Sequence, residues 1–360
     1  MAIDGLTTDE PGLGTSSGDY RGGWVDRLVR LPHRLPGPAL GWLLVLSAGV
    51  MLVANAVLWL SGATPVGSVE PNLIVPAAIL VYFFGLIGLM AQVGRSAFDE
   101  FRPALAAGTS DPDRLRFELT RIPDRQALFA IGFGIGVSVF LITATGSQDT
   151  SDIPPAVATV AWALWWMALG AMALAVFYTL RQLRWVSRLY AAATSIDLFD
   201  TQPINAFSRL TATSAMGILV IGLVMMGPWE EPSSTGQDAA GFLLDLGPLP
   251  LLLPVAAASF VLPLRGMHRR LVVEKGRLLA ASNARLKQTL ALIHQTVDTK
   301  DFEHADELQK TLTSLLAERE VLAKLATWPW SPGMLRGFAT ATLLPVGLWL
   351  VFRVLERVVQ

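Results

Sequence analysis

Seven stretches of this 360-residue chain contain no aspartate, glutamate, lysine or arginine. They cover residues 35–69, 71–94, 126–148, 153–180, 210–229, 246–264 and 337–352. A membrane-spanning helix needs about 20 consecutive apolar residues, and every stretch except the last reaches about that length. Only 16% of the residues are charged, and soluble proteins carry roughly 25%. The sequence therefore predicts an all-α, polytopic membrane protein with seven transmembrane helices, six within 38–263 and the seventh at 334–353.

The lysine and arginine residues are concentrated in alternate loops. Four precede the first stretch, six lie between the second and third, four between the fourth and fifth, and twelve between the sixth and seventh. The three other loops contain none and carry acidic residues instead. Basic loops remain in the cytoplasm. We therefore expect a cytoplasmic N-terminus and an exoplasmic C-terminal tail, residues 354–360.

The seventh stretch is the shortest. Its 16 uncharged residues rise only about 24 Å, against a hydrocarbon core of about 30 Å. The flanking Arg336 and Arg353 can extend toward the two surfaces. Trp328 and Trp330 are predicted to anchor its inner end at the membrane interface. We expect the segment to cross, and the alternative is that it stays on one side.

The first 37 residues divide into two parts. Residues 1–20 are rich in glycine, serine, threonine and acid, which predicts a disordered tail and no cleaved signal peptide. Residues 21–37 alternate apolar residues with arginines. This second pattern fits a short basic helix lying in the membrane interface, or simply a basic flank that sets the orientation of the first span.

The predicted cytoplasmic loops contain helix signals. Asp111 and Pro112 are an N-cap and a proline at the first helical position. The apolar face that follows consists of Leu115, Leu119 and Ile122. A second helix is expected to begin at residues 201–203 and to run through Phe207 into the fifth span. The fourth span is expected to continue as a helix through Tyr190.

Residues 264–330 form a long polar segment with apolar residues every seven positions, which predicts a cytoplasmic antiparallel helical hairpin. Its first seam contains Val272, Leu279, Leu286, Leu290, Ile293 and Val297, with Asn283 as a polar register residue. Its second seam contains Leu308, Leu312, Leu315 and Leu322. Residues 264–297 hold seven basic residues and one acid, net +6, and residues 298–326 hold four basic residues and seven acids, net −3.

The opposite net charges favour the association of the two helices of the hairpin. The basic first helix could alternatively bind nucleic acid, but residues 264–297 contain no phenylalanine, tyrosine or tryptophan and no basic run along the helix. Membrane lipid is therefore the expected partner of the arginines at its base, and nucleic acid is not.

Metal and thiol chemistry are disfavoured by residue type. The chain has no cysteine, and none of its four histidines lies in a predicted span. Gly136 and Ser138 form a Gly-x-Ser pattern, but a membrane serine nucleophile needs a histidine base. Ser138 is therefore expected to pack or to form a hydrogen bond. We predict no catalytic residue, no metal, no cofactor and no enzyme activity.

The span interiors offer few polar residues. Asn55 is expected to make one hydrogen bond to another helix, and Gly132, Gly134 and Gly136 are expected to permit close helix packing. Prolines in the sixth and seventh spans predict kinked helices, which can line a pore or simply pack in a bundle. The pore or vestibule candidates are Thr340, Thr342, Pro345, Asp245, Glu230 and Glu231, with hydration of the span's edge as the alternative for Asp245.

This layout of spans and loops resembles the seven-transmembrane ion channels of the insect odorant and gustatory receptor type. The resemblance covers the order of the spans and no signature motif. It implies that residues 264–326 correspond to the cytoplasmic anchor that joins four subunits in that family, and hence that this chain forms a homo-oligomer, a tetramer joined through the hairpin. It also implies that residues 338–352 correspond to the helix that lines the cation pore.

Three functions follow from the sequence. The first is a homo-oligomeric channel-like or sensory membrane protein, with the pore lined by the last helix. The second is a non-catalytic membrane scaffold whose hairpin binds a protein partner. The third, and least favoured, is a membrane-embedded enzyme that acts on lipid. Abundant arginine, alanine and glycine suggest a prokaryotic plasma membrane.

Overall fold

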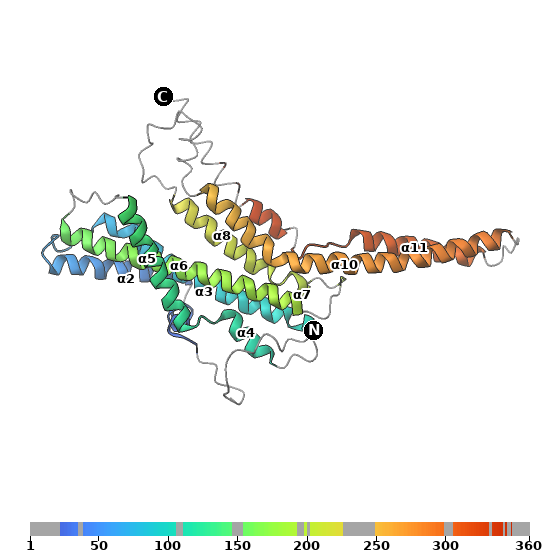
Figure 1. The fold of residues 1–360 in the computed structure, drawn as a ribbon, viewed down its shortest axis with the longest axis horizontal. Coiled ribbons are helices and arrows are strands. Elements are labelled where there is room, and N and C mark those ends of the chain that lie inside the picture. Colours follow the sequence, from blue (N-terminus) through green and yellow to red (C-terminus); the bar gives the residue numbers. More distant parts are fainter. Residues whose placement is uncertain are drawn as a thin grey trace, which may run out of the picture. The chain divides into compact units, whose positions relative to one another are not determined.

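The computed structural model describes residues 22–34, 39–105, 111–145, 154–192, 198–199, 202–225, 249–298, 305–330, 333–340, 343 and 347. Every regular element in these ranges is a helix, which confirms the predicted all-helical fold for this part of the chain (Figure 1). The chain divides into two compact units. Residues 7–96 and 111–185 belong to the N-terminal unit, and residues 97–110 and 186–360 belong to the C-terminal unit.

Three helical stretches among the described residues are long and apolar enough to cross a membrane. They are Gly41–Leu60, Pro71–Ala104 and Pro155–Tyr190. The elements in them are α2 (Ala39–Leu60), the short η2 (Pro71–Leu73), α3 (Ile74–Phe101), η3 (Arg102–Ala104) and α6 (Pro155–Ala192). These stretches coincide with the first, second and fourth predicted spans, as expected of a membrane protein.

The other predicted spans stay predictions. Three of them coincide with helices, namely α5 (Asp124–Thr145), α8 (Ser208–Met225) and the first part of α10 (Leu249–Asp298). Most of the seventh lies outside the described residues. The predicted tails at 1–20 and 354–360 lie outside them as well.

In the N-terminal unit α2 packs against α6 and the short η2. The buried apolar residues of this core are Ala54, Leu58, Leu73, Val157 and Leu164. Asn55 is buried beside them. The hydrogen bonds of its side-chain amide differ from the predicted hydrogen bond to another helix. Its Nδ2 donates to the carbonyl oxygen of Met51 at 2.8 Å, and its Oδ1 accepts from the backbone N–H of Glu70 at 2.9 Å. Asn55 therefore fastens the loop that follows its own helix.

Helix α1 (Trp24–Arg34) packs against protein in the same unit. Val25 and Val29 are buried, and α1 contacts α2 and α5. The backbone N–H of Trp24 donates to Oδ1 of Asp124, at the start of α5, at 3.0 Å. The predicted basic interfacial segment thus contains a helix whose apolar side faces neighbouring helices.

Helix α4 (Pro112–Thr120) begins as the sequence predicts. The Asp111 side chain accepts a hydrogen bond from the backbone N–H of Arg114 at 2.9 Å, and Pro112 occupies the first helical position. Leu115, Leu119 and Ile122 are all buried. The cap fixes where the helix begins, and the apolar face fixes which side it buries.

Helices α5 and α6 meet at two glycines. A Cβ on Gly134 would lie 2.4 Å from Cβ of Ala173, and a Cβ on Gly170 would lie 3.0 Å from Cγ2 of Ile131. A Cβ on Gly132 or on Gly136 would meet no atom within 4 Å. Ser138 is buried and donates to the carbonyl oxygen of Gly134 at 2.7 Å, which is the packing and hydrogen-bonding role expected of it.

The C-terminal unit begins with a cluster of three buried rings. Phe101, Tyr190 and Phe207 pack with centroids 5.1 to 5.6 Å apart. Tyr190 Oη donates to the carbonyl oxygen of Ile204 at 2.8 Å. The predicted continuous helix through Phe207 is wrong in one respect. The short α7 (Gln202–Asn205) ends, a turn places Phe207 in the cluster, and α8 then begins at Ser208.

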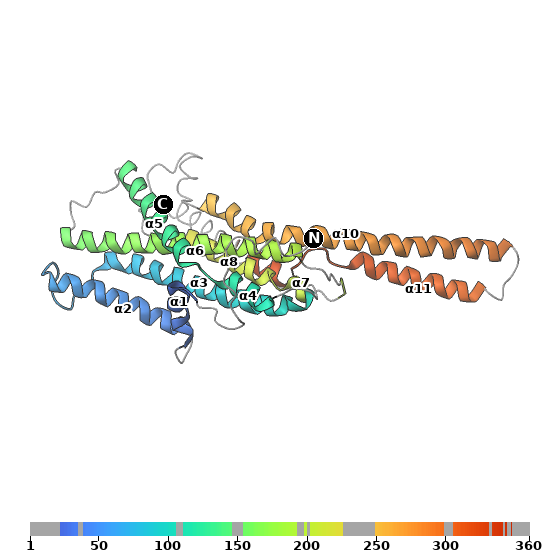
Figure 2. The same ribbon diagram turned by 60° about the horizontal axis from the view of Figure 1, so that its bottom comes forward.

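Helix α10 is 50 residues long and continues through Pro254 and Pro263 without a break. Its first part packs against α8. Helix α11 (Ala305–Lys324) lies alongside its second part in both views (Figures 1 and 2). Contacts join His268 to Thr327 and Lys275 to Ala323, so the two helices run in opposite directions. The described part of this pair, residues 264–298 and 305–324, is called the arm below.

Candidate functional site

Five rings from three segments form a continuous stack where α11 ends. In order they are His268, Trp328, Trp330, Phe260 and Phe338, and this set is called the ring stack. Successive centroids are 3.9, 4.3, 5.3 and 4.5 Å apart, with interplanar angles of 9°, 7°, 12° and 16°. The stack joins α10, residues 325–330 and the helical residues 333–340. It therefore connects the base of the arm to the start of the last helix.

The two tryptophans lie on a bend of the chain. Residues 328–330 form this bend, with the buried Pro329 at its centre. Proline disfavours a helical conformation at the residue before it, so α11 does not continue through this segment. The rings of Trp328 and Trp330 are nearly parallel, at 7°. Phe260 and His268 of α10 complete the stack on either side of them.

Hydrogen bonds hold the same junction. His268 Nδ1 lies 2.8 Å from the carbonyl oxygen of Thr327. Lys275 Nζ donates to the carbonyl oxygens of Ala323 and Leu325 at 2.7 and 2.8 Å. These carbonyls are at the C-terminal end of α11, where the helix leaves them without intrahelical partners and where a cation is favoured. Lys275 thus caps α11 from the neighbouring helix.

An apolar cluster continues the ring stack toward α8. Its buried residues are Ala212, Ala215, Leu219, Ala256 and Phe260, and Met334, Phe338 and Trp330 pack against them. Each stacked ring pair contributes about 0.5–1.5 kcal/mol beyond the burial of its area. The first turns of the last helix are therefore fixed against both α8 and α10.

The predicted seam residues lie on the arm. Leu279, Asn283, Leu286 and Ile293 are half-buried on α10. Leu308 and Leu315 are half-buried on α11, and Leu322 is buried. Trp328 and Trp330, predicted as interface anchors, are half-buried in the ring stack.

Of the predicted pore and vestibule residues, Thr340 is described and exposed. Thr342, Pro345, Asp245, Glu230 and Glu231 lie outside the described residues. The structure therefore brings together the tryptophans and the arm, and it leaves the predicted pore lining as a prediction.

The N-terminal unit contains a buried polar cluster that sequence reasoning missed. Gln182 of α6 is fully buried, and its Nε2 donates to the carbonyl oxygen of Met90 at 3.2 Å. Tyr178 Oη donates to the carbonyl oxygen of Thr120 at 3.4 Å. Nearby, Arg181 forms an ion pair with Glu118 at 2.9 Å. The available signal was the return of polar residues at 181 and 182, directly after a charge-free stretch.

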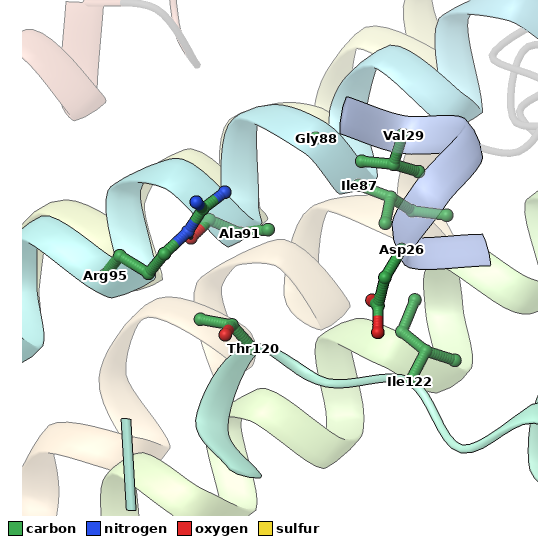
Figure 3. A pocket seen from close by; sticks show the side chains of 8 residues that line it. All are labelled: Asp26, Val29, Ile87, Gly88, Ala91, Arg95, Thr120 and Ile122. Atoms are coloured by element: carbon green, nitrogen blue, oxygen red, sulfur yellow. The ribbon is translucent and has the colours of Figure 1, made fainter. Parts of the chain in front are cut away.

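A small cavity lies beneath α1 in this unit (Figure 3). Its polar lining comes from Asp26, Arg95 and Thr120, and its volume is about 10 Å³. A cavity of this size has room for about one water molecule. The arrangement can hold a bridging water, and it is too small for an organic ligand.

Neither unit offers a metal centre in its described part, because no three histidine or acidic side chains there lie close enough to share an ion. Sequence reasoning also missed His268, Phe260 and Phe338, since partners 60 to 78 positions apart leave no pattern that a single sequence displays. The chain matches no protein-family model, and it shows no detectable similarity to any curated protein or solved structure.

Proposed function

We propose that this chain is a homo-oligomeric, non-catalytic plasma-membrane protein of channel-like or sensory type, with seven spans and a cytoplasmic arm. The observation that carries the proposal is the ring stack. It connects the arm directly to residues 333–340, which lead into the predicted pore helix. A displacement of the arm would therefore be transmitted to the last helix through stacked rings.

Electrical recording tests this function. The purified full chain is reconstituted into planar bilayers, and currents are measured across a range of voltages and cation gradients. We expect cation-selective currents, because the predicted outer loops are acidic and attract cations. Bilayers that contain folded protein and carry no current under any condition would contradict the proposal.

A second measurement asks whether the ring stack transmits movement. Trp330→Ala removes the ring that bridges Trp328 and Phe260. We expect it to change the open probability without changing the single-channel conductance, since the exchanged side chain lies outside the pore lining. Val273→Ala, at an exposed position of α10 outside the stack, is the matched control and should leave both quantities unchanged.

A scaffold function is the second candidate. It is supported by exposed apolar side chains on the arm, among them Val273 and Val321. Deleting residues 272–325 from the full chain should then abolish capture of one specific cytoplasmic partner while membrane insertion persists. Unchanged capture after the deletion would exclude this function.

A further inference from the structure

One side of the arm is exposed, although apolar residues recur along it with heptad spacing. On α10, Val272, Leu290 and Val297 are 46%, 37% and 54% exposed. Leu279 and Asn283 continue the same row and line a groove between the two helices. On α11 the groove is lined by Leu316, which is 46% exposed, and by Arg319, Glu320 and Ala323. These residues together are called the open face.

The buried row of α10 is a different one. In this part of the helix Leu271, Ser282 and Thr289 are buried. The open-face residues Val272, Asn283 and Leu290 each come one position later, which is about 100° further around the helix. Helix α11 therefore uses the buried row and leaves the neighbouring apolar row uncovered.

The spacing of the uncovered row indicates what covers it. Apolar residues that recur every seven positions, with one asparagine among them, are typical of a helix that packs against another helix. On α11 the groove holds Leu316 and Ala323 beside Arg319 and Glu320, so the apolar part of the open face lies mainly on α10. Two paired helices with such a side are half of a four-helix bundle. A second pair of helices with the same spacing would complete it.

We propose that the open face binds the open face of a second copy of the chain, so that two arms form a four-helix bundle. The inference rests on the proposed membrane function, because copies inserted in one orientation hold their arms parallel. A two-fold axis running along the arms then places α10 of each copy against α11 of the other. The interface is self-complementary, as two-fold symmetry requires.

Charge favours the arrangement in which α10 of each copy meets α11 of the other over one in which the two α10 helices meet. The part of α10 in the arm, residues 264–298, holds seven basic residues and two acids, net +5, and α11 holds three basic residues and four acids, net −1. The charge of α10 therefore repels α10 of the other copy and favours its α11. Exposed ion pairs contribute only about 0.2–1 kcal/mol each. Burial of the apolar row therefore supplies most of the affinity, and charge sets which helices meet.

The absence of cysteine from the chain permits a direct test. Two differently tagged full-length copies are expressed together in membranes, one carrying Asn283→Cys and the other Leu316→Cys. Both positions line the groove at one level of the arm. Each copy has one thiol, so a disulfide that joins the two tags forms only between chains. We expect mild oxidation to give at least about tenfold more mixed disulfide than the control pair, given the high effective concentration of facing groups.

The control pair is Ala281→Cys with Glu318→Cys. Both residues are exposed, and each lies two positions from an open-face residue, just over half a turn away. This pair reports random collision of copies in the same membrane. Equal yields from the two pairs would overturn the proposed interface.

The number of copies of the full chain per lipid nanodisc, measured by mass, distinguishes failure of the arm interface from failure of the proposed oligomer. Leu290→Lys places a charge on the open face and is expected to lower the number of copies per disc. Multiple copies that persist in Leu290→Lys, with equal disulfide yields, would overturn the arm interface and leave the proposed oligomer intact. A single copy in every variant would overturn both, and a disulfide from Asn283→Cys to a different protein would overturn self-pairing in favour of the scaffold function.

Discussion

Gly134 lies at a close contact between α5 and α6, and the nearby Gly136 serves as the control for its substitution. A Cβ there meets Cβ of Ala173 at 2.4 Å and the carbonyl oxygen of Leu169 at 3.1 Å. We expect Gly134→Ala to lower the unfolding free energy by about 1–3 kcal/mol, because the two helices must separate to admit the methyl group. Unfolding by SDS titration in mixed micelles measures the change.

Gly136→Ala is the matched variant, since nothing lies within 4 Å of its added Cβ. It should be neutral, or stabilising by about 0.5–1 kcal/mol, as alanine is favoured over glycine inside a helix. The sequence indicated a small-residue face at 132, 134 and 136, and it could not say which glycine touches a neighbour. Residues two positions apart lie about 200° apart around a helix, so Gly134 points away from Gly132 and Gly136. Which side of α5 faces α6 depends on how α5 is rotated in the packed unit. Equal losses at both positions would argue against the described contact.

At the scale of elements, Lys275 is the clearest link between α10 and α11. Replacing it with methionine removes the donor to the carbonyl oxygens of Ala323 and Leu325 while keeping an unbranched side chain. We expect a loss of about 1 kcal/mol from the last turn of α11, which is the usual contribution of a cation at a helix C-terminus. Hydrogen exchange of the amides in residues 320–325 should quicken several-fold by mass spectrometry. Lys287→Met, at an exposed position of α10 away from that end, should leave the exchange unchanged.

Helix boundaries were predictable where a local signal sets them. The cap at Asp111 follows from nearby residues. The continuity of α10 from residue 249 to 298 does not, because Pro254 and Pro263 predict kinks and the helix continues through both. The break between α7 and α8 was not predictable either. Phe207 leaves the helix to join Phe101 and Tyr190, which are 106 and 17 positions away in the sequence. Burial of a third ring in that cluster outweighs the hydrogen bonds that a continuous helix would keep. The ring stack was missed for the same reason.

For the whole molecule, the charge distribution makes the sharpest prediction. Of 28 lysines and arginines, 26 fall in the predicted cytoplasmic segments. Reporter enzymes that are active in only one compartment, fused to each end of the full chain, should therefore report opposite sides of the membrane. A fusion after residue 300, within the predicted cytoplasmic segment, should match the N-terminal fusion. Two ends on the same side would mean that the number of spans is even.

Helix α10 also gives the molecule mechanical leverage. Its 35 residues beyond Pro263 extend about 52 Å at 1.5 Å per residue. Pro263 lacks the N–H that would bind the preceding turn, so bending is easiest there. A tilt of about 10° at that point sweeps the distal tip through about 9 Å. By the same proportion, a small force at the tip of the arm balances a larger force applied close to Pro263.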